Sequence, residues 1–189
     1  MDPDAQLEAS IAFLNDPIGD ESHRARSRRA LSYLLANADK AHPRLLLELE
    51  TKPPEAQLAV IEALPLFGRS ESIGTLEQLL LEGSDIVSWT AGQALGGHPL
   101  PTAREVLSHA LSSPRRESVI GALGGLTRRG ENSACDSLRP LLIDRDPLIR
   151  YHAVQAGSRL ACLSNQDLTD VATVDPDETV RELAVRLLR

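Results

Sequence analysis

The chain has 189 residues, of which 42% are hydrophobic and only 3% are aromatic. This length suffices for one domain with a substantial core, and the apolar content excludes a disordered chain. Lys and Arg number 20 against 27 Asp and Glu, so the formal net charge is −7, which argues against nucleic acid as the main partner because phosphate contacts need a basic face.

The predicted elements, taken in chain order, are pairs of helices. Residues 1–37 form a degenerate first unit whose second helix carries charge where later units carry aliphatic residues, as expected of a terminal cap. Further first helices are expected near residues 45–49, 73–81, 103–111, 135–143 and 168–174. Each is followed by a second helix with apolar residues at four-residue steps, such as Val87, Ala91 and Leu95.

The last two units, within residues 144–189, contain one motif written twice. DRDPLIRYHA begins at Asp144, and DPDETVRELA begins at Asp175, 31 residues later. Asp146 and Asp175 each precede a proline and are predicted to be helix N-caps. A fixed period of this size indicates a repeat protein, whose units bury a core between neighbours and leave a long concave surface for function. We therefore predict one all-α domain over residues 1–189, a solenoid of about six helical hairpins that form a curved superhelix.

The motif resembles a known repeat family. Its pattern, D-x-x-x-x-[VI]-R-x-x-A, is complete in the last two units and weaker from Asp85 to Leu95. It is similar to HEAT repeats of the short bacterial, phycobilisome-lyase-like type. The resemblance implies that the motif residues are structural, with Asp144, Arg150, Asp175 and Arg181 in a ladder between repeats. It also implies binding and scaffolding, with enzymes as a minority.

Sequence motifs for catalysis, metals and cofactors are missing. The five histidines have no metal-ligand spacing and no neighbouring glutamate, and no phosphate-binding loop or GxSxG motif is found. We predict no catalytic residue, no metal and no cofactor.

The two cysteines, Cys135 and Cys162, form no CxxC pair and lie among apolar residues. Each is predicted to be a small buried hydrophobe. The first residues, Met1 to Glu8, lack the features of a signal peptide, and no segment is long enough to span a membrane. These features predict a cytoplasmic protein with no membrane partner.

Two groups of residues are candidates for protein binding. Arg26, Arg28 and Arg29 crowd one short helix with His23 and Arg24. They form either a solvated cap or a docking strip for an acidic protein.

The second group lies two positions after an inward aliphatic residue, and hence about 200° around the helix on the outward face. It contains Trp89, Gly121 and Tyr151, with Gly125 on the same glycine-rich helix as Gly121. They predict a shallow groove with aromatic walls about 20 Å apart. The alternative is that the glycines allow tight helix packing.

The sequence thus predicts a non-catalytic scaffold, adaptor or inhibitor that binds another protein on the concave face of its second helices. An immunity-type protein that blocks a basic toxin is one form, to which the acidic charge is suited. The alternative is a bilin-lyase-like enzyme subunit that handles a tetrapyrrole or its carrier protein. The sequence does not identify the partner or the oligomeric state.

Overall fold

A computed structural model describes residues 2–14, 21–130 and 134–189. For residues 3, 21–25 and 55 it describes the backbone and not the side chain. The described residues form twelve α-helices and no strand. The helices pair into six hairpins, so the predicted all-α solenoid is confirmed. The separate status of residues 1–37 as a cap stays a prediction.

The hairpins follow one another along the chain. Their first helices are α1 (Pro3–Leu14), α3 (Ala38–Thr51), α5 (Glu71–Glu82), α7 (Thr102–Ala110), α9 (Cys135–Leu138) and α11 (Asn165–Val174). Their second helices are α2 (Glu21–Ala36), α4 (Leu58–Ala63), α6 (Asp85–Gly97), α8 (Arg116–Arg129), α10 (Pro147–Arg159) and α12 (Glu178–Leu187). Three short 3-10 helices, η1 (Pro54–Ala56), η2 (Leu64–Phe67) and η4 (Arg139–Ile143), complete the described elements.

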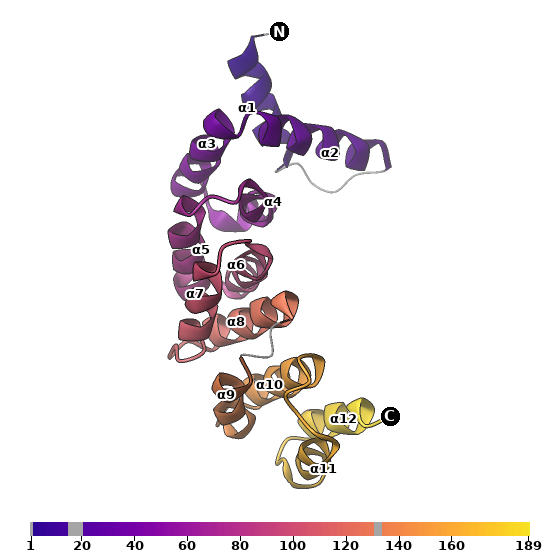
Figure 1. The fold of residues 1–189 in the computed structure, drawn as a ribbon. Helices are drawn as coiled ribbons and strands as arrows, with labels where there is room; N and C mark the ends of the chain where they lie inside the picture. The colour runs from indigo at the N-terminus through magenta and orange to yellow at the C-terminus, as the bar shows by residue number, and fades with distance from the viewer. Residues whose placement is uncertain (1, 15–20, 131–133) are drawn as a thin grey trace.

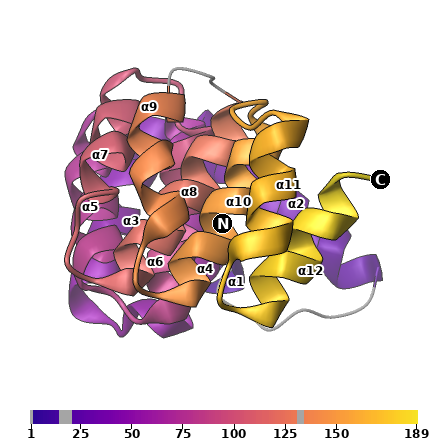
Figure 2. The same cartoon turned by 90° about the horizontal axis from the view of Figure 1, so that it is seen from below.

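The hairpins stack into an arc with the chain ends far apart (Figure 1). Helices α3, α5, α7 and α9 lie along its outer side, and α4, α6, α8 and α10 lie along its inner side. Seen along the stack, the two rows remain separate, with α12 beyond α10 (Figure 2). The second helices therefore line the concave face.

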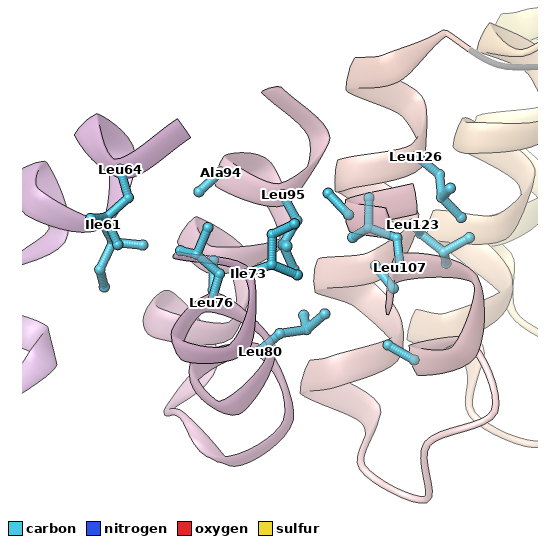
Figure 3. Packing of buried hydrophobic residues seen from close by; sticks show 14 of the residues in the cluster. Ile61, Leu64, Ile73, Leu76, Leu80, Ala94, Leu95, Leu107, Leu123 and Leu126 are labelled. Carbon is cyan, nitrogen blue, oxygen red and sulfur yellow. The ribbon is translucent and has the colours of Figure 1, made fainter. Parts of the chain in front are cut away.

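The core fills the space between these two rows. Leu76 and Leu80 of α5, Leu95 of α6 and Leu107 of α7 are each at most 1% exposed and contribute to one apolar layer (Figure 3). This layer is continuous from Leu7 to Cys162, and a smaller cluster joins α10 to the last hairpin. Each repeat therefore depends on its neighbours for burial, as the solenoid prediction requires.

The turns that start the last two second helices differ in one respect from the prediction. Asp146 is the N-cap of α10 and accepts a hydrogen bond from the Leu148 N–H. In the last repeat, however, Asp177 is the N-cap, not Asp175. The carboxylate of Asp175 accepts from the Asp177 N–H, so it shapes the turn rather than caps the helix.

Cys135 and Cys162 form a disulfide across 27 positions of sequence, with their Cα atoms 5.2 Å apart. The prediction that they are independent buried hydrophobes is therefore wrong. Cys135 begins α9 and Cys162 follows α10, so the folding of one hairpin brings them together. The two cysteines lie 27 positions apart in the sequence, so only the tertiary arrangement of the hairpin shows that they pair.

Candidate functional site

A groove opens on the inner face where α6, α8 and α10 lie side by side. Its volume is about 400 Å³. The residues that line it are Trp89, Gln93, Leu123, Gly124, Thr127, Arg128, His152, Gln155, Ala156 and Arg159. All come from the second helices of three consecutive repeats, so the stacking of the solenoid itself forms the groove.

Trp89 forms the aromatic wall of this groove. Its helix starts where Ser84 leaves the turn in an extended conformation, and the register that buries Val87 and Ala91 leaves Trp89 37% exposed. The indole lies over Gly124: a Cβ added there would be only 2.6 Å from Cζ3 of the indole. Gly124 therefore gives the indole its space.

The second aromatic side chain in the groove is His152, whose ring centroid lies 6.2 Å from that of Trp89. The His152 ring also lies near the ring of Tyr151 in an edge arrangement, with the two ring centroids 5.5 Å apart. Burial lowers the pKa of His152 below its ordinary value, so the imidazole is neutral at pH 7. A neutral ring beside an exposed indole offers flat surface and one hydrogen-bonding edge.

The fixed charge of the groove is positive. Arg128 and Arg159 line it and are exposed, and no carboxylate is among the lining residues. Arg128 donates one hydrogen bond to the carbonyl oxygen of Gln93, at 3.2 Å, and lies over Gly97. In an acidic chain, this local excess of arginine makes the groove complementary to an acidic group.

Gly121 and Gly125 do not face the groove, so the predicted outward position is wrong for both. They are buried where α8 crosses α6. A Cβ at Gly121 would lie 2.5 Å from the carbonyl oxygen of Ser88, and one at Gly125 would clash with the backbone of Gly92. The second helix packs against neighbours on two sides, so a position 200° from the core is not necessarily exposed.

Tyr151 also departs from the prediction. It is half-buried and packs against the small apolar cluster that joins α10 to the last hairpin. The adjacent residue, His152, takes the predicted place opposite Trp89, and the two rings are far closer than the expected separation of about 20 Å. The groove residues that the sequence analysis did not identify include His152, Gln155 and Arg159, all on α10. Gly124 follows Ile120 by four residues on the less buried stripe of α8 and was identifiable in that register.

The predicted basic strip lies on α2, outside the groove. Arg28 and Arg29 are exposed, and the guanidinium of Arg26 lies 5.5 Å from the ring centroid of Phe13. The side chains of His23 and Arg24 are outside the described residues. A binding role for Arg26, Arg28 and Arg29 stays a prediction.

Two other arginines have structural roles at helix ends. Arg115 donates to the carbonyl oxygens of Leu81 and Gly83, at 2.6 and 2.7 Å. Arg129 donates to that of His98 at 2.7 Å. Each bonds terminal carbonyl groups of the preceding repeat, which leaves these side chains committed to stability.

The ladder implied by the resemblance contains one rung between repeats. Arg150 donates to both carboxylate oxygens of Asp175, each at 2.9 Å. Asp144 accepts from the Asp146 N–H within its own turn, and Arg181 donates to the backbone oxygens of Asp175 and Pro176.

Within residues 2–14, 21–130 and 134–189, no cluster of three or more His, Cys, Asp or Glu side chains is placed to hold a metal ion. No described helix combines the length and apolar character needed to cross a membrane.

The fold and its inner face define an α-solenoid of stacked helical hairpins. Residues 42–124 match the family model described as HEAT repeats, so the predicted resemblance to HEAT repeats is confirmed over this part of the chain. The phycobilisome-lyase-like subtype stays an expectation. No curated protein matches the sequence. A crystal structure titled as an engineered protein is similar at a TM-score of 0.49 and 20% identity, over 100% of this chain and 90% of that one.

Proposed function

We propose that this protein is a non-catalytic scaffold that binds an acidic segment of another protein in the groove formed by α6, α8 and α10. HEAT repeats are generally protein-interaction scaffolds, and solenoids use their concave surface for binding. The observation that carries the proposal is the exposed indole of Trp89 in a groove that is also lined by two arginines and by no carboxylate.

The chemistry of the groove suits recognition. Trp and Arg are the residue types that most often dominate binding energy at protein interfaces. A guanidinium group binds a carboxylate with two parallel hydrogen bonds, so Arg159 would fix the position of an acidic side chain. Trp89 would cover the apolar part of the same segment. An adaptor for an acidic protein is the form of this activity that the groove favours, whereas an immunity-type inhibitor of a basic toxin would need an acidic surface.

Copurification of the partner from the native host tests the proposal. Trp89→Ala removes the anchor and should weaken binding by at least about 30-fold, which corresponds to about 2 kcal/mol. Arg159→Glu reverses the groove charge and should abolish binding of an acidic segment. The exposed turn residue Arg145 provides the matched control, since Arg145→Glu makes the same charge change outside the groove.

The expected outcome is loss of the partner in both groove variants, with unchanged circular dichroism, and full binding by the Arg145→Glu control. If Trp89→Ala and Arg159→Glu bind the partner fully and only Arg28→Glu disrupts binding, the groove is rejected as the binding site. The basic strip on α2 is then the better candidate. A coloured protein with a bound tetrapyrrole would favour the bilin-lyase-like alternative instead.

A further inference from the structure

A second groove lies along the turns between the fifth and sixth hairpins, and none of its residues lines the inner groove. Its volume is about 470 Å³. It is lined by Leu142, Ile143, Asp144, Arg150, Asp167, Asp170, Val171, Val174, Asp175 and Pro176. We call it the turn groove.

The turn groove has an unusually exposed apolar rim. Ile143 is 85% exposed and Val174 is 78% exposed, the highest values among the exposed large hydrophobic residues of the described chain. The two occupy the same repeat position, 31 residues apart, each directly before the turn aspartate. Leu142 and Val171 are half-buried against the small apolar cluster beneath. Single exposed aliphatic residues are ordinary, but two at the rim of one apolar groove indicate a binding surface.

The charge of the turn groove is acidic. Four carboxylates line it, and its one lining cation, Arg150, already donates to Asp175 and to the backbone of Asp144. Asp170 is exposed, and its carboxylate accepts a hydrogen bond from the Gln166 side chain. Hydrogen bonds from Ser164 hold the pKa of Asp167 below its ordinary value, so this carboxylate is ionised at pH 7. Ionised carboxylates beside an apolar surface, of which Asp170 is the exposed one here, attract a cationic partner.

We propose that the turn groove binds a protein segment in which an aliphatic side chain is flanked by arginine or lysine. The aliphatic side chain packs between Ile143 and Val174, and the cationic side chains reach Asp167 and Asp170. The chain's net charge of −7 favours approach of a basic segment from solution. This site has the opposite charge to the inner groove, so the two surfaces select different segments.

A peptide titration tests both parts of the recognition. The probe is a labelled peptide, Arg-Arg-Leu-Leu-Arg-Arg, whose binding to the full chain is followed by fluorescence anisotropy. Saturable binding is expected, and it should weaken at least about tenfold when the leucines are replaced by serine. The peptide Glu-Glu-Leu-Leu-Glu-Glu should not bind at the turn groove. Equal binding of the leucine and serine peptides would mean that charge alone acts and would overturn the proposal.

Variants locate the binding. Ile143→Ser, Val174→Ser and Asp170→Asn should each weaken the arginine-leucine peptide at least about fivefold, with unchanged circular dichroism. Ile86→Ser is the matched control, because Ile86 is 49% exposed and lies outside both grooves. This variant should bind the peptide as tightly as the wild type does.

Three further results would overturn the proposal. The first is no binding of the peptide to the wild type, and the second is equal weakening by Ile86→Ser. The third is a dimer in sedimentation that Ile143→Ser dissociates, which would assign the turn groove to a second copy of the chain.

Discussion

Arg150 and Asp175 join the last two repeats through a buried, two-pronged ion pair, with both N–O distances at 2.9 Å. The side chains are 8% and 5% exposed. Burial by itself raises the pKa of Asp175, but the hydrogen bonds from Arg150 and the Asp177 N–H, with the charge of Arg150, outweigh it and lower the pKa. The pair is therefore ionised and holds the last hairpin on the stack.

Removing one partner of this pair should be costly. Asp175→Ala leaves the Arg150 charge buried and should lower the free energy of unfolding by about 3–5 kcal/mol. Urea unfolding followed by circular dichroism measures the loss. Arg181→Ala is the matched control, because Arg181 occupies the same repeat position but donates only to backbone oxygens of its own turn. If the two variants lose equal free energies of unfolding, the ion pair between repeats adds no more stability than hydrogen bonds within one turn.

Two glycines within helices, Gly121 of α8 and Gly74 of α5, give predictions of opposite sign. Gly121→Ala should destabilise the protein by about 1–3 kcal/mol, because its Cβ would meet the Ser88 carbonyl oxygen across the helix crossing. Gly74→Ala on α5 should stabilise it by about 1 kcal/mol, since nothing lies within 4 Å of a Cβ there. Thermal melting of both variants checks the pair. A rise in melting temperature for Gly121→Ala would contradict the crossing.

Reduction of the Cys135–Cys162 disulfide should destabilise the fifth hairpin. Chain-entropy arguments for a loop of this size give about 3–4 kcal/mol. Melting with and without a reductant, alongside the Cys135→Ser/Cys162→Ser double variant, measures the effect. The double variant should have a lower melting temperature than the oxidised wild type, both with and without the reductant. An unchanged melting temperature under reduction would show that the bond has no stabilising role. Such bonds persist in oxidising compartments, so the presence of the bond in cells would also test the predicted cytoplasmic location.

His98 predicts how stability depends on pH. Its buried ring donates from Nε2 to the Arg69 carbonyl oxygen and accepts at Nδ1 from the Leu100 N–H, which requires the neutral form. Burial is the main reason that its pKa lies below 6.5. The unfolded chain therefore binds the proton more readily. The contribution of neutral His98 to the free energy of unfolding is fully present above the pKa of this residue in the unfolded chain. It is lost as the pH falls towards the pKa of His98 in the folded protein.

The melting temperature should therefore fall between about pH 7.5 and about pH 5.5. His98→Gln should reduce this slope, because glutamine lacks the titrating group; His42 and His152, whose pKa values burial also lowers, account for the slope that remains. The exposed His109 is the control: His109→Gln should leave the slope unchanged. If His98→Gln retains the full slope, the stability change arises from other groups.

Periodicity was sufficient to predict the hairpins, because the aliphatic positions of each helix recur at helical spacing. The burial of Gly121 could not be predicted from periodicity in the same way. One buried residue, Val119, defines one direction of burial, whereas α8 packs on both α6 and α10. The sequence analysis identified Trp89 correctly as exposed, but its neighbour across the groove depends on how α6 and α10 stack around Gly124. The disulfide depends on the same tertiary arrangement.

Photo-cross-linking from the groove tests the central claim most directly. A benzoylphenylalanine is placed at Gln155, which lines the inner groove, or at Gln78, which is exposed on the outer helix α5. The proposed function predicts that Gln155, and not Gln78, cross-links to one protein of the native host. Mass spectrometry of the linked peptide should find an acidic segment, and Arg159→Glu should abolish the product. Cross-linking only from Gln78, or to a basic segment from Gln155, would contradict the account.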